Sequence, residues 1–136
     1  MKFQIIRKVD VVPAECEAVS ARVQLSEHEG DEGAIKSWSL EGYENSMYVV
    51  FLVEADGVRT PFGLVVAAGE KTVEVTWWID SQYRNRGYGK SMIDELAQVL
   101  RAHGVTGVHA RVLGIHTERS YALYDRLSSH FGASDA

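Results

Sequence analysis

The sequence predicts a mixed α/β, α+β-like fold in a single domain spanning residues 1–136. Three observations lead to this prediction. A strand pattern and a helix pattern open the chain, three strand patterns follow one another in its middle, and helix, strand and helix patterns close it. An antiparallel meander followed by strand, helix, strand and helix is typical of such domains. We therefore expect a mostly antiparallel central sheet with helices on both faces.

The N-terminal part predicts a strand at about residues 2–9, where apolar and polar side chains alternate. Pro13 is suited to the first turn of a helix that ends near Leu25. Four apolar side chains recur there at the spacing of one helix face: Val12, Cys16, Val19 and Val23. The acidic segment SEHEGDEG, residues 26–33, is expected to form a loop, and a short helix to follow at about residues 34–40.

Three consecutive strands are predicted in the middle, at residues 47–54, 62–68 and 72–80. The first is a nearly continuous apolar run, as expected for a strand covered on both faces. Asp56 and Gly57 predict a hairpin turn, and residues 69–71 a second turn. The third strand has two distinct faces. One carries Val73, Val75, Trp77 and Ile79, and the other carries Thr72, Glu74, Thr76 and Trp78.

A helical period then begins. Its apolar face holds Met92, Ile93, Leu96, Ala97 and Leu100. Gly104 stands where the C-terminal cap of this helix belongs, and residues 107–113 predict another strand. Thr117 is suited to cap a last helix. One face of that helix carries Ser120, Leu123, Tyr124 and Leu127.

The composition narrows the functional classes. The chain is 46% hydrophobic and 24% charged, ordinary values for a globular protein, and its net charge of -5 argues against nucleic-acid binding and against an anionic membrane surface. Cys16 is the only cysteine, so neither an intrachain disulfide nor zinc-ligand spacing exists, and the histidines form no metal pattern. No signal peptide or membrane span is recognisable. We therefore expect a cytoplasmic protein without a metal site.

The stretch QYRNRGYGKS, residues 82–91, admits three glycine motifs. The phosphate loop of nucleotide hydrolases fails because Arg84 stands where its first glycine is required. The dinucleotide fingerprint fails because Met92 stands where its third glycine belongs. The remaining motif is Arg-x-x-Gly-x-Gly, formed by Arg84, Gly87 and Gly89 between a strand and a helix.

This position favours an anion. The first turn of a helix leaves backbone N–H groups unpaired, and its dipole attracts negative charge. Glycines allow a phosphate to approach those amides closely. Arg84, Arg86 and Lys90 add positive charge beside them. The sequence therefore predicts a pyrophosphate site.

Two segments resemble the GNAT (Gcn5-related) N-acetyltransferase family: WWIDSQYRNRGYGKSMIDEL, and HTERSYALYDRL at residues 116–127. The resemblance covers roughly residues 46–127. It implies acetyl-CoA as acyl donor, a V-shaped opening between the fourth and fifth strands, and direct acetyl transfer to an amine without an acyl-enzyme. It also implies that Ile79 binds the pantetheine arm of the cofactor and that most of the other cofactor-binding residues hold its pyrophosphate. These other residues are Arg84, Asn85, Arg86, Gly87, Tyr88, Gly89, Lys90, Ser91 and Thr117.

The same resemblance implies catalytic roles. Tyr124 matches the tyrosine that protonates or hydrogen-bonds the leaving sulfur, although the helix pattern also fits a core tyrosine. Glu74 matches a general base that some members carry on this strand, and a salt bridge to Arg111 is the alternative. Asp80 and His116 are rivals for relaying the amine's proton, and water is a further route.

The sequence departs from the family at two places. Thr117 replaces the usual Asn and cannot offer the second group of an amide. The family ordinarily continues with two more strands, and the residues that follow Leu127 are too few for a strand pair. Because an uncovered sheet edge is unfavourable, we expect a homodimer that completes the sheet or the cleft.

The expected acceptor is a small cationic amine. Trp38, Tyr43 and Tyr48 lie where the family binds its substrate, near an acidic loop, and both features suit a cation. A protein or peptide amine is an alternative, because lost strands would open the cleft. A catalytically silent acyl-CoA-binding module that acts by contacting a partner is a further alternative.

Overall fold

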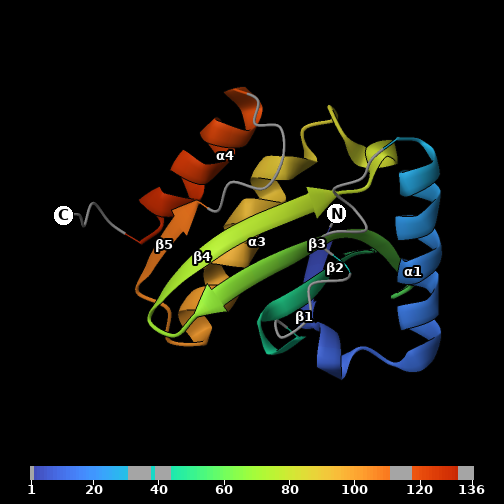
Figure 1. Ribbon diagram of the computed structural model, residues 1–136, viewed down its shortest axis with the longest axis horizontal. Coiled ribbons are helices and arrows are strands. Elements are labelled where there is room, and N and C mark those ends of the chain that lie inside the picture. Colours follow the sequence, from blue (N-terminus) through green and yellow to red (C-terminus); the bar gives the residue numbers. More distant parts are fainter. Residues whose placement is uncertain (1, 31–37, 39–43, 111–117, 132–136) are drawn as a thin grey trace.

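A computed structural model describes residues 2–30, 38, 44–110 and 118–131. Its sheet has the strand order β1-β2-β3-β4-β5, in which β4 and β5 are parallel and the other neighbours antiparallel (Figure 1). The predicted mixed α/β architecture is therefore confirmed. The described strands are β1 (Lys2–Arg7), β2 (Met47–Val53), β3 (Arg59–Gly69), β4 (Thr72–Ile79) and β5 (Gly107–Ala110). The described helices are α1 (Pro13–His28), α3 (Tyr88–Ala102) and α4 (Glu118–Ser129).

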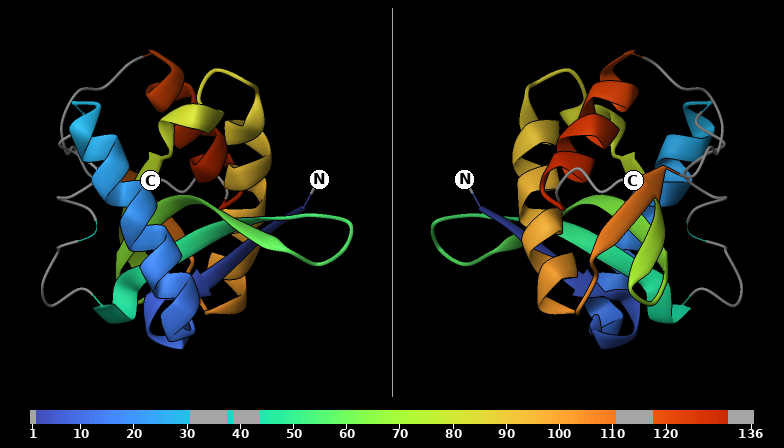
Figure 2. Two further views of the ribbon diagram at one scale, coloured as in Figure 1. Left: turned by 90° about the vertical axis from the view of Figure 1, so that its right-hand side faces the viewer. Right: turned by 90° about the vertical axis from the view of Figure 1, so that its left-hand side faces the viewer.

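The helices form layers on the two faces of the sheet (Figure 2). Helix α1 covers one face, where Val19 and Val23 pack in a cluster with Phe51, Leu64 and Trp78. Helices α3 and α4 cover the other face, where a second cluster includes β4 side chains and the apolar faces of both helices. The predicted split of β4 follows this division, since Val73 and Val75 belong to the α3 side and Trp78 to the α1 side.

Helix α1 is longer than predicted. The segment from Ser26 to His28, expected to begin a loop, continues the helix instead. Ser26 lies three residues after Val23 and shares its buried face, with 1% of its surface exposed. Tertiary packing therefore prolongs the helix into a segment whose acidic composition suggested a loop. The helix expected at residues 34–40 lies outside the described residues except for Trp38, whose ring lies 4.1 Å from Lys8 Nζ.

The meander follows the predicted turns, and of its three strands only β3 is longer than predicted, since β2 and β4 each end one residue earlier. Gly57 has a positive φ of 87°, and the Val58 N–H donates to Asp56 Oδ1 at 3.0 Å, which confirms the hairpin turn. Strand β3 starts at Arg59, three residues earlier than predicted, because this tight turn lets pairing begin at once. The first strand is shorter than predicted: β1 ends at Arg7 and a 3-10 turn follows at Lys8–Asp10.

Helices α3 and α4 have the predicted faces. All five predicted core residues of α3 are buried, as are Tyr124 and Leu127 in α4, and Gly104 has a φ of 86° after the end of α3. Thr117 and residues 111–113 lie outside the described residues. A polar contact joins the two helices, because Asp94 accepts hydrogen bonds from Arg126 Nε (2.8 Å) and Nη2 (2.7 Å) and lies 2.7 Å from His130 Nε2.

This contact predicts an acid-sensitive contribution to stability. The Arg126 and His130 hydrogen bonds lower the pKa of Asp94 from 3.8 to about 2. Because the folded-state pKa lies below the unfolded one, the contribution is present above about pH 4 and is lost as the pH falls toward 2. We expect Asp94→Asn to be less stable than the wild type at pH 7, and the difference to disappear near pH 2. Urea unfolding of both proteins across this range measures it. A difference that stayed constant with pH would contradict this account.

Candidate functional site

The segment between β4 and α3 carries the predicted glycine motif. Asn85 (φ 61°) and Gly87 (φ 81°) both adopt left-handed conformations, and Gly87 is the N-cap of α3. Glycine takes this conformation without strain, and asparagine tolerates it better than most residues. The bend allows α3 to begin at Tyr88, so the unpaired N–H groups of its first turn lie directly after the loop. The predicted loop-to-helix geometry is thus present.

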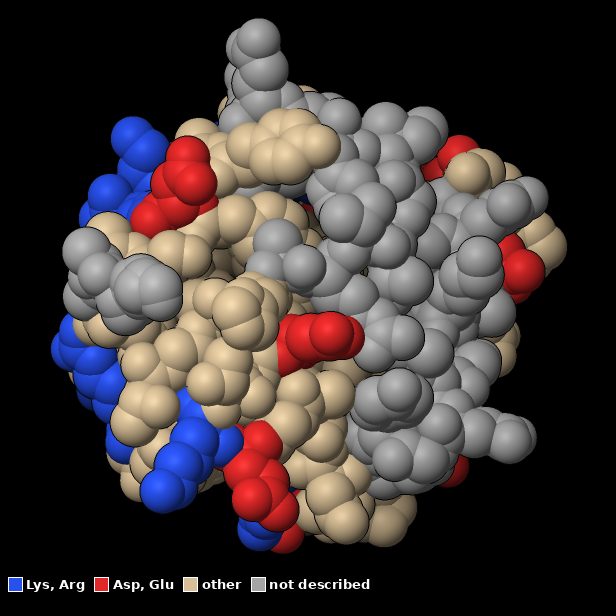
Figure 3. Space-filling view, turned by 60° about the vertical axis from the view of Figure 1, so that its left-hand side comes forward, with Lys and Arg blue, Asp and Glu red and all other residues tan. Residues whose placement is uncertain are grey.

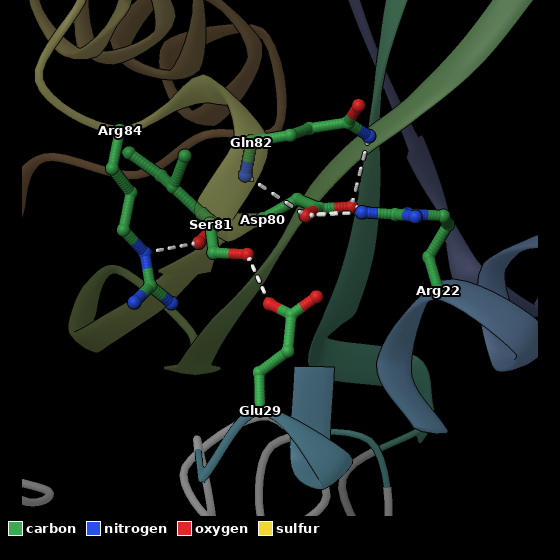
Figure 4. Close-up of polar contacts among 7 residues, drawn as sticks. Arg22, Glu29, Asp80, Ser81, Gln82 and Arg84 are labelled. Atoms are coloured by element: carbon green, nitrogen blue, oxygen red, sulfur yellow. Dashed lines mark hydrogen bonds and ion pairs between the residues drawn. The ribbon is translucent and has the colours of Figure 1, made fainter. Parts of the chain in front are cut away.

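Three basic side chains accompany this loop. Arg84, Arg86 and Lys90 are exposed. Arg84 has an additional role, since its Nε donates to the carbonyl oxygen of Ile79 at 2.7 Å (Figure 4). On the face shown in Figure 3, basic side chains lie along one margin, with acidic side chains beside some of them.

Gly89 has a packing role that the sequence did not indicate. A Cβ placed there would lie 3.0 Å from Cδ1 of Leu123. The missing side chain therefore lets the first turn of α3 approach α4 closely. A bulky residue at this position would disturb the contact between the helices as well as the loop. The same contact brings the loop beside the residue that precedes Tyr124.

The backbone of β4 offers hydrogen-bonding groups next to this loop. The Asp80 N–H donates to the Phe62 carbonyl at 2.8 Å, which fixes the phase of the ladder with β3. Hydrogen-bonded pairs alternate along an antiparallel ladder with pairs whose backbone groups point outward. Because Asp80 and Phe62 form a hydrogen-bonded pair, the pairs that contain Trp77 and Ile79 are of the kind whose backbone groups point outward. Their N–H and C=O groups therefore face the side of β4 that lies away from β3.

On that side lies β5, which is described as far as Ala110. The last described pair is Val75 with Ala110, and residues 76–79 of β4 extend beyond it. The outward groups of Trp77 and Ile79 lie in this extension. Ile79 is the last residue of β4 and lies directly before the loop segment, and its contact with the cofactor stays a prediction.

Tyr124 lies against this part of β4. Its ring centroid is 4.2 Å from that of Trp77, and the residue is 9% exposed. Burial raises the pKa of Tyr124, and a hydrogen bond with the Thr76 side chain opposes part of that rise. A phenol with a raised pKa keeps its proton at neutral pH. Tyr124 thus carries a protonated hydroxyl group beside Thr76 and Trp77 of β4.

Glu74 points to the other face of the strand. It lies opposite Ala68 of β3 and His109 of β5, on the face shared by Thr76 and Trp78, and it is exposed. The Tyr124 ring packs on Trp77, which belongs to the other face of β4, whereas its hydroxyl group is hydrogen-bonded to Thr76, which shares the face of Glu74. The rival His116, the alternative partner Arg111 and the cofactor candidate Thr117 lie outside the described residues.

Asp80 is held in a manner that does not suit a proton relay. Its carboxylate accepts hydrogen bonds from Arg22 Nε (2.6 Å) and Nη2 (2.8 Å), and the residue is 1% exposed (Figure 4). A carboxylate engaged on both oxygens and removed from solvent is poorly placed to accept a substrate proton. No sequence pattern indicated Arg22, which stands 58 residues from Asp80 in a regular helix.

A separate hollow of about 670 Å³ lies far from the loop. It is lined by Arg7, Asp10, Tyr48 and His103, together with Ile5, Ile6 and Asn45. His103 follows the C-terminal end of α3, whereas the loop precedes its N-terminal end, about 22 Å away along a 15-residue helix. Tyr48, expected near the acceptor, is instead buried and hydrogen-bonded to His103 Nδ1 at 3.1 Å. Its expected contact with the acceptor is therefore not supported.

Other kinds of site find no support in the part of the chain that the structure describes. Within it, no set of three or more His, Cys, Asp and Glu side chains is arranged for a metal ion. Nor does a described helix combine the length and apolar character needed to span a membrane.

Known structures resemble this fold. A GNAT-family acetyltransferase from Bacillus anthracis is 16% identical with a TM-score of 0.61, and the match covers 93% of this chain and 79% of that one. A chimeric spermidine N-acetyltransferase SpeG from Vibrio cholerae is 10% identical with a TM-score of 0.61 and the same coverage. An aminoglycoside 6'-N-acetyltransferase complexed with coenzyme A is 15% identical with a TM-score of 0.52, covering 81% and 61%. At such identities the likeness shows the fold.

The sequence itself gives the family. No curated protein matches the chain. The model of the acetyltransferase (GNAT) family, however, matches residues 17–128, which include most of α1, the glycine loop and most of α4. This match and the fold agree with the resemblance of the two sequence segments. The chain belongs to the GNAT acetyltransferase family.

Proposed function

We propose that the protein transfers an acetyl group from acetyl-CoA, the donor that the family uses, directly to a primary amine. One observation carries the proposal. A protonated, buried phenol, Tyr124, lies beside the extension of β4 that leads into the glycine loop. A hydroxyl group that keeps its proton supports a role as hydrogen-bond donor to the departing sulfur.

The residues present fit acetyl-CoA. The N–H groups of residues 88–91 and the side chains of Arg86 and Lys90 would hold the pyrophosphate, because helix N-termini and basic side chains both stabilise phosphate. Gly87 leaves room for that approach, since a Cβ there would meet nothing within 4 Å. The outward groups of Trp77 and the N–H of Ile79 would pair with the amides of the pantetheine arm, whereas the Ile79 carbonyl already accepts from Arg84 Nε. Acetyl-CoA supplies the acetyl group as a thioester.

Tyr124 would act on the sulfur. A thiol has a pKa of about 8.5, so a phenol whose pKa lies above 10 is the weaker acid. Tyr124 therefore stabilises the departing thiolate mainly by donating a hydrogen bond. Glu74, which shares its face of β4 with Thr76, is the proposed base for the amine's proton.

The proposed acceptor is a small cationic amine. Two structurally similar proteins are named for spermidine and aminoglycosides, both of which carry several amines. The exposed carboxylates Glu27 and Glu29 at the end of α1, and Glu74 on β4, supply negative charge on the described part of the α1 side. A protein or peptide amine is the alternative. The expected homodimer stays a prediction.

Matched glycine variants test the cofactor site. Gly87 and Gly104 have nearly the same φ (81° and 86°), and neither would bring a Cβ within 4 Å of other atoms. Alanine at either position should therefore cost a similar backbone strain of about 1 kcal/mol. We expect only Gly87→Ala to weaken acetyl-CoA binding, on the order of tenfold, in a calorimetric titration with ATP as the control ligand.

The outcomes separate the hypotheses. Binding of acetyl-CoA without turnover of any amine in a panel of polyamines and aminoglycosides would indicate a silent acyl-CoA-binding module. Absence of binding by the wild-type protein would refute the proposed function. Equal weakening by Gly87→Ala and Gly104→Ala would attribute the effect to helix stability and not to the loop.

A further inference from the structure

A buried ion pair connects α1 to the end of β4. Asp80 follows the last residue of β4, and its carboxylate pairs with Arg22 of α1 through two hydrogen bonds of 2.6 and 2.8 Å. The Asp80 side chain is 1% exposed and that of Arg22 is 28% exposed. A bidentate pair of this kind fixes orientation as well as distance. A buried carboxylate without its partner would be strongly unfavourable.

Asp80 also organises the chain that follows it. Its Oδ1 accepts from the Gln82 N–H at 3.3 Å, and its Oδ2 from Gln82 Nε2 at 3.3 Å, so that it caps the short 3-10 turn Ser81–Tyr83. Its backbone carbonyl accepts from the Tyr83 N–H at 2.9 Å. The direction in which the chain leaves β4 is therefore set by the carboxylate and carbonyl of one residue.

Further contacts hold the same turn. The Ser81 hydroxyl donates at 2.8 Å to Oε2 of Glu29, the C-cap residue of α1, and Arg84 Nε donates to the Ile79 carbonyl at 2.7 Å (Figure 4). The Tyr83 ring stacks on Phe62 at 5.1 Å. Helix α1 thus holds the start of the glycine loop from the face of the sheet opposite α3. It does so by charged contacts, not by the apolar packing that fixes its own position.

We propose that Arg22 is a positioning residue, which through Asp80 holds the segment from Ser81 to Gly87 in the conformation that binds the donor. This inference rests on the proposed function for the identity of the ligand. It implies that α1, which packs on the face of the sheet opposite α3, is connected to the pyrophosphate loop through the ion pair between Arg22 and Asp80. A change in α1 would then alter donor affinity without any contact between α1 and the donor.

Three variants separate positioning from folding. Arg22→Gln leaves Asp80 buried and unpaired, so the protein should lose stability. Asp80→Asn keeps an oxygen for the Gln82 N–H and removes the buried charge, and the partly exposed Arg22 can be hydrated. The double variant Arg22→Gln/Asp80→Asn leaves neither charge buried. The last two should therefore be more stable than Arg22→Gln, while all three lack the charged link.

The measurements are coenzyme A affinity by calorimetry, thermal unfolding, and native-state cleavage by trypsin after Arg84 and Arg86. We expect the dissociation constant for coenzyme A to rise on the order of tenfold in all three variants, including the two that recover stability. Trypsin should cleave the loop several-fold faster in Asp80→Asn than in the wild type. Arg7→Gln, which breaks an exposed ion pair with Asp10, is the control and should change neither the coenzyme A affinity nor the rate of trypsin cleavage.

The positioning role would be overturned if the double variant recovered coenzyme A affinity together with stability and trypsin cleaved the loop no faster than in the wild type. The ion pair would then have a structural role alone. Failure of the wild-type protein to bind coenzyme A would instead refute the proposed function and remove donor binding from this inference. Trypsin cleavage tests the holding of the loop in either case.

Discussion

Tyr124→Phe should lower kcat roughly 10- to 100-fold while coenzyme A affinity stays within about twofold of wild type, because a hydrogen bond to a charged group contributes about 1.5–3 kcal/mol. The ring lies 4.2 Å from Trp77 and is mostly buried, so phenylalanine retains its packing. What is lost is the hydroxyl that would donate to the thiolate, together with its bond to Thr76. The loss therefore falls on the chemical step and not on donor binding.

The rate is measured as thiol release from acetyl-CoA with the amine that the wild type uses best, and affinity by calorimetry. Tyr121→Phe is the matched control, because this tyrosine lies on the same helix with 56% of its surface exposed. It should behave as the wild type. Full activity in Tyr124→Phe would mean that Tyr124 has only a packing role and that it does not donate a hydrogen bond to the departing sulfur.

Gly63→Ala should lower the free energy of unfolding by about 2–4 kcal/mol, an effect at the upper end for a single added methyl group. A Cβ at this position would lie 2.3 Å from the backbone oxygen of Trp78 and 3.3 Å from Cα of Ile79. Neither is the end of a flexible side chain, so the two strands would have to separate. The strand end that precedes the glycine loop would be displaced with them.

Urea unfolding measures the effect, and Gly107→Ala is the control in the same sheet. A Cβ at Gly107 would make ordinary contacts of 3.6 and 3.7 Å with the Thr72 side chain, so stability should change by less than about 0.5 kcal/mol. Similar stability in the two variants would mean that β3 and β4 can move apart at little cost.

The sequence by itself determined the order of the elements and the position of the glycine loop. These features are local: helix and strand periods, turn residues such as Asp56 and Gly57, and a glycine motif following a strand all act within a few residues. The division of β4 into two faces followed from the period of two, which pleating imposes on any strand. The resemblance of two segments to the GNAT family further predicted acetyl-CoA as the acetyl donor and a catalytic role for Tyr124.

The tertiary structure alone decided what depends on distant partners. Ser26 became helical because it is buried with Val23, and Gly89 faces Leu123 of another helix. Asp80 looked like a free carboxylate at a strand end until folding brought Arg22 to it across 58 residues. Burial and pairing arise between elements, and a local pattern contains no information about which elements will meet. The loop was therefore visible in the sequence, and the residues that hold it in place were not.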